Sequence, residues 1–234
     1  LANLDDLVFG GWDLFPDDAY SAARNAAVLS NEHLTQVQDE LAAVKPMQAV
    51  FFPEYVKRLR GEHVKAQTNK HELVEAVRDD IRRFKRDNGV DRCVSVWCGS
   101  TEVHHEPTAV HQTLKNFERG LEQSDPGISP SMIYAYALMK EGVSYANGAP
   151  NLTTDVPAFA ELARELSVPI SGKDFKTGQT LMKTMIAPGL KSRMLGIRGW
   201  YSTNILGNRD GEVLDDPESF KTKEESKKSV LDYI

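Results

Sequence analysis

The stretch KHELVEAVRDDIRRFKRDNGVDRCVSVWC, residues 70–98, decides the fold of this chain. Its apolar residues first recur at the spacing of one helical face, at Leu73, Val74, Val77, Ile81 and Phe84. Gly89 is placed to end that helix after Asn88. Arg92–Cys98 follows as a strand that is almost wholly apolar in its middle. Such a strand beside a helix is typical of a sheet covered on both faces, so the segment predicts a doubly wound, Rossmann-like α/β fold.

The sequence before this segment continues the alternation of helix and strand. Apolar positions at helical spacing predict a helix over Asp17–Val44, which Lys45-Pro46 closes. Gln48–Phe52 reads as a short buried strand that Pro53 ends.

The sequence after it changes character at the turn-rich run Gln123–Gly127. We therefore divide the chain into two expected domains, residues 1–126 and 127–234. The elements expected in the second domain are a helix from Ser129-Pro130 to Lys140, a helix over Asp155–Leu166 with Asp155 as N-cap, a helix over Gly178–Ala187, a strand over Lys191–Ser202, and a last helix that opens at Asp216-Pro217 and runs to the end of the chain.

Composition excludes several classes of protein. The 234 residues are 41% hydrophobic and 26% charged, as in ordinary globular domains. A net charge of -6 argues against nucleic acid as the main partner, because phosphate backbones select basic surfaces. The apolar runs are too short to cross a bilayer. The two cysteines, Cys93 and Cys98, point to opposite faces of a strand, so we expect free thiols and a cytoplasmic location.

Two polar segments could bind a ligand. Gly172–Thr180 precedes a helix, and the free backbone N–H groups at such a start can hold a phosphate, although a plain capped helix start explains the same residues. Asn204–Gly211 could grip sugar or ribose hydroxyls, or could be a simple turn at Asp210-Gly211.

Two further groups carry ionisable side chains. Lys223 and Lys227 share one face of the last helix and could stabilise negative charge on oxygen, yet lysine-rich helices usually face water. A cluster of carboxylates and histidines suggests a metal, but its spacing matches no zinc template, so we expect no metal site there: Glu102, His104, His105, Glu106 and His111.

Taken in order, these segments resemble the inositol-1-phosphate synthase family. The motifs that carry the resemblance are Gly10-Gly11-Trp12-Asp13, Phe51-Phe52-Pro53-Glu54-Tyr55, Val96–Glu102, Ser129-Pro130-Ser131, Asn147-Gly148-Ala149-Pro150, Gly172–Thr180, Asn204–Gly211 and Ser219–Lys227. The chain departs from the family at Cys98, Gly99 and Ser100, which replace Thr, Ala and Asn, and at Leu181, which replaces a lysine.

The resemblance implies roles for particular residues. Catalytic roles fall to Asp174, Lys183, Asp210, Lys223 and Lys227. Contacts to NAD fall to Gly10, Gly11, Asp13, Val50, Cys98, Gly99, Ser100, Thr101, Gly148, Ala149, Asp174, Thr177, Asn208, Arg209, Asp210 and Lys223. Contacts to glucose 6-phosphate fall to Thr177, Gly178, Gln179, Thr180, Asn204, Leu206 and Asn208.

The resemblance also implies a domain plan and a reaction. We expect an α/β fold with a Rossmann-like NAD-binding domain, incomplete in this chain because the family's glycine-rich loop would precede Leu1, plus an α+β catalytic and tetramerisation domain. The implied reaction is the NAD-dependent conversion of D-glucose 6-phosphate to myo-inositol 1-phosphate, an isomerisation without net redox that feeds phospholipid biosynthesis. The expected assembly is a homotetramer, and a monovalent or divalent cation is left open.

Two alternatives stay open at this point. One is another NAD-dependent sugar-phosphate oxidoreductase of the same two-domain plan, which would release NADH. The other is a non-catalytic oligomer that binds sugar phosphates.

Overall fold

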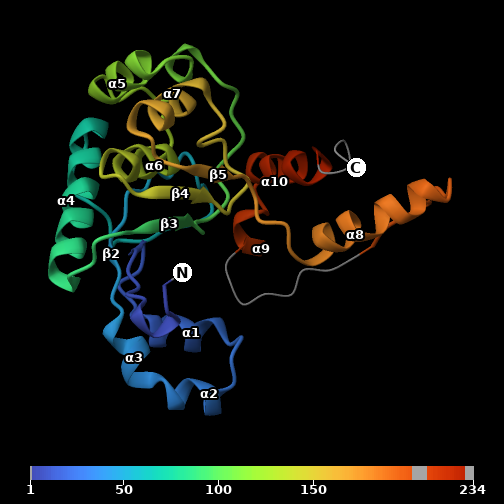
Figure 1. Ribbon diagram of the computed structural model, residues 1–234, viewed down its shortest axis with the longest axis horizontal. Helices are drawn as coiled ribbons and strands as arrows, with labels where there is room; N and C mark the ends of the chain where they lie inside the picture. Colours follow the sequence, from blue (N-terminus) through green and yellow to red (C-terminus); the bar gives the residue numbers. More distant parts are fainter. Residues whose placement is uncertain (1, 202–209, 230–234) are drawn as a thin grey trace.

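The computed structural model describes residues 2–201 and 210–229, with side chains as far as Lys227 (Figure 1). In chain order its elements are η1 (Leu4–Asp6), β1 (Trp12–Asp13), α1 (Ala19–Ala26), α2 (Asn31–Gln36), α3 (Gln38–Ala43), β2 (Met47–Gln48), α4 (Lys70–Asn88), β3 (Val94–Trp97), η2 (Ala109–His111), α5 (Leu114–Glu122), α6 (Pro130–Lys140), β4 (Ser144–Asn147), α7 (Pro157–Leu166), β5 (Ile170–Gly172), α8 (Gly178–Ser192), α9 (Asp210–Val213) and α10 (Pro217–Ser229).

Helix α4 has the ends that the sequence predicts. The Asn69 side chain accepts hydrogen bonds from the N–H groups of His71 and Glu72, which are among the unpaired donors of the first turn. Gly89 ends the helix with φ 61°, a left-handed conformation that glycine adopts without strain. The buried face of α4 packs against α6.

The central sheet is parallel and has the order β3-β4-β5. Residue Trp97 at the end of β3 pairs with Asn147 of β4, and Asn147 pairs with Gly172 of β5. All three strands therefore end at one edge, and helices α5, α6 and α7 provide the crossovers (Figure 1). A shorter parallel pair, β1 with β2, lies apart from this sheet.

The core forms around α6, whose residues Pro130–Met139 are all buried. Aliphatic side chains of α4, α5 and α7 pack against α6 or against the sheet beside it. A helix that is apolar on every side fits only a fully enclosed position. The ligand-facing edge of the sheet thus rests on a rigid, buried support.

The helix expected over residues 17–44 is instead three short helices, α1, α2 and α3. Ala27 ends the first in a left-handed conformation with φ 53°. The Ser30 side chain then accepts the N–H of His33 and starts the second. These local hydrogen bonds compete successfully with a continuous helical pattern.

The expected strand Gln48–Phe52 was also wrong in extent, because β2 ends at Gln48. Ala49 makes only an isolated bridge with Val64. The Val50 N–H donates to the hydroxyl of Tyr134 at 2.7 Å, so this segment leaves the ladder to bind a side chain of α6.

Three further expectations in the second half need correction. Helix α8 continues to Ser192, past Pro188, and residues 193–201 form no strand. Helix α7 begins at Pro157 with Val156 as its N-cap. Asp155 instead forms an ion pair with Lys173 at 2.8 Å. The last helix does open at Pro217, and Asp216 accepts the N–H of Ser219 as predicted for a cap.

The sheet crosses the boundary that we placed between residues 126 and 127. Strand β3 precedes that point, whereas β4 and β5 follow it and complete the same sheet and core. The division of the chain into two domains at this point stays a prediction.

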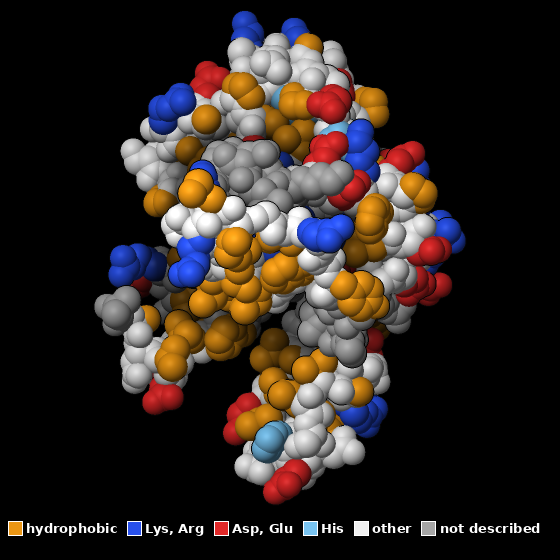
Figure 2. All heavy atoms as spheres, turned by 90° about the vertical axis from the view of Figure 1, so that its right-hand side faces the viewer, with side chains coloured by type: hydrophobic (Ala, Val, Ile, Leu, Met, Phe, Trp, Pro, Cys, Tyr) orange, Lys and Arg blue, Asp and Glu red, His pale blue; other side chains and the backbone are white. Residues whose placement is uncertain are grey.

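Two surfaces are more apolar than the sequence pattern predicted. Val94 and Val96 of β3 are 81% and 52% exposed, so one face of that strand is uncovered by the described residues. Helix α8 projects from the body (Figure 1), and hydrophobic side chains gather on the face toward which it projects (Figure 2). Among the described helices, none combines the length and apolar character that crossing a membrane requires.

Candidate active site

A cavity of about 850 Å³ opens between the β1–β2 pair, strand β3 and the N-terminal end of α6. Seven of the residues expected to contact NAD line it: Gly10, Gly11, Asp13, Val50, Cys98, Gly99 and Ser100. Thr101 directly follows this set and is buried. The cavity has a size that suits a dinucleotide, since ligand pockets commonly measure about 300–1,000 Å³.

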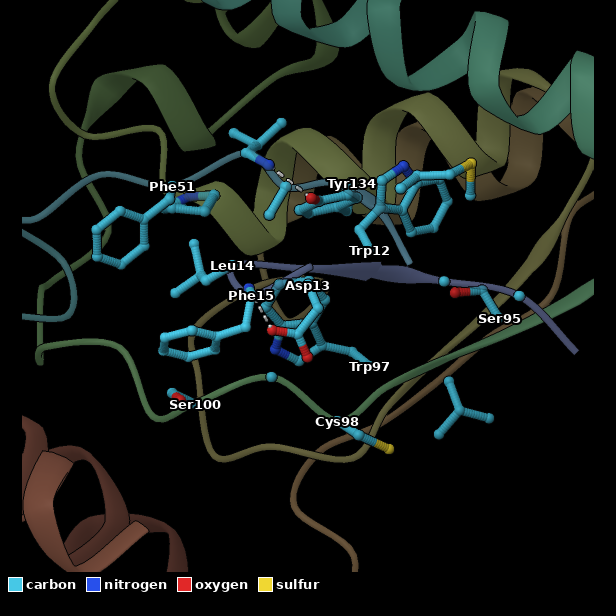
Figure 3. Close-up of a pocket in the computed structure, with 18 of the residues that line it drawn as sticks. Trp12, Asp13, Leu14, Phe15, Phe51, Ser95, Trp97, Cys98, Ser100 and Tyr134 are labelled. Atoms are coloured by element: carbon cyan, nitrogen blue, oxygen red, sulfur yellow. Dashed lines mark hydrogen bonds between the residues drawn. The ribbon is translucent and has the colours of Figure 1, made fainter. Parts of the chain in front are cut away.

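An aromatic wall lines part of this cavity. The ring of Tyr134 packs against both Trp12 and Trp97, with centroids 5.1 and 5.2 Å away (Figure 3). Burial raises the pKa of the Tyr134 hydroxyl, which keeps it neutral and able to accept the Val50 N–H. The indole ring of Trp12 is held in place, because its N–H donates to the carboxylate of Asp80 on α4 at 2.8 Å.

The loop that carries Asp13 is shaped by close packing. A Cβ on Gly10 would stand 2.6 Å from the ring of Phe84, so only glycine fits there without a shift. A Cβ on Gly11 would meet nothing within 4 Å, which leaves its backbone open to a ligand. The Asp13 carboxylate accepts the N–H of Phe15 at 3.0 Å (Figure 3).

The loop after β3 packs against the loop that follows β4. The Gly148 N–H donates to the carbonyl of Trp97 at 2.9 Å, and a Cβ on Gly148 would lie 2.7 Å from that oxygen. A Cβ on Gly99 would lie 2.7 Å from the Trp97 ring. Gly148 lets two backbones approach at the edge where parallel strands end and ligands bind, and Gly99 leaves room for the indole ring of Trp97.

A second group of residues gathers beside this edge and consists of charges. Lys223 of α10 forms an ion pair with Asp210 of α9. Burial, and next the charge of Lys223, lower the pKa of Lys227, with Lys183 acting in the same direction and Asp174 and Asp210 opposing it. The other four residues expected to be catalytic therefore lie within electrostatic reach of the Lys227 ammonium group.

Asp174 joins the two groups. It follows β5 and has φ 56°, and its N–H donates to the carbonyl of Ala149 at 3.0 Å. Its carboxylate accepts the hydroxyl of Ser226 on α10 at 2.8 Å and lies 3.3 Å from the ammonium of Lys176. Asp174 thus ties the β4 loop to the β5 loop through its backbone N–H and the β5 loop to α10 through its carboxylate.

The expected phosphate contacts fall at the start of α8. Thr177 is its N-cap without a side-chain capping bond, and Gly178 opens the helix with φ 52° and no atom within 4 Å of a Cβ. Gln179 occupies the first turn and Thr180 is buried. The start of a helix offers unpaired N–H groups and favours negative charge. The remaining expected contacts lie outside the described residues: Asn204, Leu206, Asn208 and Arg209.

Sequence reasoning missed three polar residues near these groups. Ser226 and Lys176 bind Asp174, and Glu102 is buried beside the cavity. The signal for Ser226 was its position on the same helical face as Lys223, three residues away. Glu102 was weighed as a metal ligand and as the last residue of the Val96–Glu102 motif, but it was given no role; both of its carboxylate oxygens accept bonds from Ser131.

The fold and the cavity together define the class of protein. A parallel sheet whose strands end beside a cavity of dinucleotide size, with helices as crossovers, is an α/β protein of the Rossmann type. A family model described as myo-inositol-1-phosphate synthase, an NAD-binding domain, matches residues 1–217. The chain belongs to the myo-inositol-1-phosphate synthase family.

Similar proteins agree with this assignment. The chain is 54% identical to inositol-3-phosphate synthase 1 of Bacteroides thetaiotaomicron, over 100% of this chain and 55% of that protein. It is 35% identical to inositol-3-phosphate synthase 1 of Oryza sativa, over 99% of this chain and 46% of that protein. A crystal structure of inositol-3-phosphate synthase from Caenorhabditis elegans matches with a TM-score of 0.88 at 29% identity, over 99% of this chain and 46% of that one. The chain spans about half the length of the relatives it matches.

Proposed function

We propose that the protein converts D-glucose 6-phosphate to myo-inositol 1-phosphate with NAD as a cofactor that undergoes no net change. The observation that carries the proposal is the convergence of Asp174, Lys183, Asp210 and Lys223 around Lys227. These residues come from the β5 loop, α8, α9 and α10. Such a cluster beside a dinucleotide-sized cavity suits a reaction that repeatedly builds negative charge on oxygen.

NAD fits the cavity on the evidence of the residues that line it. Gly11 leaves its backbone open, and the aromatic wall of Trp12, Tyr134 and Trp97 offers apolar surface. The side chains of Cys98, Gly99 and Ser100 differ from the family, so we expect backbone contacts from this loop to matter most. When bound, NAD would accept a hydride from C5 of the sugar and return it in the last step.

The substrate phosphate is proposed to lie at the start of α8. Thr177, Gly178 and Gln179 would surround it with a hydroxyl and backbone N–H groups, and the open space beside Gly178 leaves room for it. Lys183, one turn and a half further along α8, lies on the side of the lysine cluster. This placement would direct the reacting carbons toward Lys223 and Lys227.

The lysines would serve the oxygen chemistry of the sugar. Lys223, held by Asp210, would stabilise negative charge on the C5 oxygen. The lowered pKa of Lys227 lets it exchange a proton nearer to neutral pH than an ordinary lysine, which suits proton transfer at C5 and C6. Asp174, whose carboxylate accepts the hydroxyl of Ser226, would keep the ammonium groups of Lys223 and Lys227 in position relative to the cofactor.

The remaining proposals concern the assembly of the protein, its location in the cell and its need for a cation. We expect a homotetramer, to which the apolar side chains exposed on α8 could contribute contact area. We expect a cytoplasmic protein, since both cysteines are free. A cation, if one takes part, would have to reach Asp174 or Asp210, and chelator treatment of the purified protein tests this.

Turnover with both products measured tests the proposed function. The purified protein that carries this chain is incubated with glucose 6-phosphate and NAD, inositol phosphate is quantified, and NADH is followed by absorbance. We expect inositol phosphate without accumulation of NADH. NADH formed in proportion to sugar consumed would indicate an ordinary oxidoreductase, and binding of both ligands without product would indicate a non-catalytic protein.

A further inference from the structure

A fully buried carboxyl group lies at the end of the loop that follows β3. Glu102 is 1% exposed and lies beside the cavity. One of its oxygens accepts the N–H of Ser131 at 2.8 Å, and the other accepts the Ser131 hydroxyl at 2.7 Å. Ser131 belongs to the first turn of α6, so the carboxyl group attaches the loop to the N-terminal end of the central helix.

A buried polar network extends this attachment to the loop after β4. The hydroxyl of Ser131 lies 2.7 Å from that of Thr153, while the N–H of Glu102 donates to the side chain of Asn151 at 2.9 Å. The Asn151 amide in turn donates to the carbonyl of Ser100 at 3.4 Å. Asn151, Ser131 and Thr153 have no exposed area, so each bond forms away from solvent, where it is strong and where its loss is most damaging.

The loop that lines the cavity is therefore held at both ends. At its beginning the carbonyl of Trp97 accepts the N–H of Gly148, and at its end Glu102 is held by Ser131. Only Cys98, Gly99, Ser100 and Thr101 lie between these two attachments. Their backbone path is thus set by the two anchors, and this matters because backbone groups are the contacts that this loop can offer a dinucleotide.

We propose that Glu102 is a positioning residue for the dinucleotide site, which holds the loop Cys98–Thr101 against the start of α6. This inference rests on the proposed function, because NAD is the ligand whose affinity the loop would control. Glu102 is not assigned a contact to the reacting atoms. Its effect passes through the backbone of the loop.

The ionisation of Glu102 gives the proposal a pH dependence that can be measured. Burial raises the pKa of Glu102 to about 7, although hydrogen bonds from Ser131 and Ser129 favour the ionised form. The titratable groups that face it are the hydroxyls of Tyr55 and Tyr145, and burial raises the pKa of both, so they stay neutral near pH 7. The carboxyl group is thus the group of this network that changes charge in that range.

The direction of the effect follows from linkage. Because the pKa in the folded state is raised above its ordinary 4.5, the fold favours the protonated form, and this contribution is complete below about pH 4.5 and lost as pH rises through about 7. A carboxylate beside the cavity would also repel the anionic pyrophosphate of NAD. The first effect predicts a loss of stability as pH rises through about 7, and the second predicts that NAD binds more weakly over the same range.

Calorimetric titration of NAD into the protein between about pH 6 and pH 9 tests the proposal. We compare the parent with Glu102→Ala, Glu102→Gln and the control Glu141→Gln. Glu141 follows the other end of α6, where its carboxylate pairs with Arg78 and Arg82, and it does not line the cavity. Melting temperatures accompany each titration, so that losses of stability are separated from losses of affinity.

We expect Glu102→Ala to weaken NAD binding about tenfold or more, because it removes two buried hydrogen bonds to Ser131. Glu102→Gln should keep affinity near that of the parent at about pH 6 and lose the decline above pH 7. Glu141→Gln should retain both the affinity and the decline.

Two results would overturn the inference. One is parent-like affinity in Glu102→Ala. The other is an unchanged pH profile in Glu102→Gln, which remains decisive even where Glu102→Ala folds poorly. A parent protein that binds no NAD at any pH would contradict the proposed function itself, and the inference would fall with it.

Discussion

The dinucleotide side and the lysine side of the site consist of different chemical groups. The dinucleotide side consists mainly of backbone, glycines and aromatic rings held by buried hydrogen bonds, such as those from Val50 to Tyr134 and from Trp12 to Asp80. The lysine side consists of charges on loops and on the last helices, where Lys223 and Lys227 face Asp174 and Asp210. The dinucleotide side sets the shape of the cavity, and the lysine side sets the charge around the sugar. Substitutions on the dinucleotide side should therefore affect NAD binding, and substitutions on the lysine side should affect turnover.

The largest effect is expected at Lys227. Replacing it by Met keeps the length of the side chain but removes an ammonium group from the centre of the charge cluster. Loss of one such group should raise the barrier by about 3 kcal/mol, roughly a hundredfold in rate. The measurement is the rate of inositol phosphate formation at saturating substrate.

Lys221→Met is the matched control for that experiment. Lys221 lies on the same helix, is mostly exposed, and pairs only loosely with Glu225 at 3.8 Å. It should lose little activity, since exposed pairs contribute at most about 1 kcal/mol. Equal rates in Lys227→Met and Lys221→Met would show that α10 has no catalytic face.

A somewhat smaller effect is expected at Asp13, on the opposite half of the site. Asp13→Ala removes a carboxylate that lines the cavity and accepts the N–H of Phe15. NAD affinity should fall at least about tenfold, the scale of a hydrogen bond to a charged group. Calorimetry measures it, and the turnover number at saturating NAD should stay within a few-fold of the parent. A loss confined to turnover would reverse the division between the two halves.

The phosphate position is tested at Gly178. Gly178→Val places a branched side chain at the start of α8, in space that no protein atom occupies, and should weaken glucose 6-phosphate binding roughly tenfold while NAD affinity is kept. Gly142→Val is a control for backbone strain, because Gly142 also has a positive φ, 70°, and open space around it, at the far end of α6. Similar losses in both variants would point to strain instead of a blocked phosphate site.

The smallest effect is expected at Ser226. Ser226→Ala removes the hydroxyl that holds Asp174, and should slow turnover about fivefold, since a buried hydrogen bond contributes about 1 kcal/mol. Ser226→Thr keeps the hydroxyl and should restore the rate. Ser192→Ala, which removes a hydroxyl that donates to the carbonyl of Gly189 within α8, is the control. A rate that Ser226→Thr fails to restore would assign Ser226 to packing.

The predictability of the fold from sequence depended on how local its determinants are. Helices α4 and α6 were predicted with their ends, because Asn69, Gly89 and Ser129 act on neighbouring residues. The strand at Gln48–Phe52 was wrong because the Val50 N–H binds a hydroxyl 84 residues away. Propensity cannot anticipate a partner at that distance.

The same distinction applies to the site. Asp174, Lys223 and Lys227 could be named from a family resemblance, but their convergence depends on how α10 meets the β5 loop. The helical face that Ser226 shares with Lys223 was its only signal, and the sequence did not show the partners of Ser226 and Glu102, which lie 52 and 29 residues away. Hydroxyl and carboxyl groups of this kind acquire a role only when a fold buries them beside those partners.

Isotope transfer tests the central claim most directly, namely that the dinucleotide side and the lysine side act together in one redox-neutral reaction. Glucose 6-phosphate carrying deuterium at C5 is converted by the protein with unlabelled NAD, and the inositol phosphate is analysed by mass spectrometry and NMR. The account predicts that the product keeps the deuterium on the carbon derived from C5, because the hydride removed there is returned before NAD leaves. Deuterium found in free NADH, or lost from the product, would contradict it.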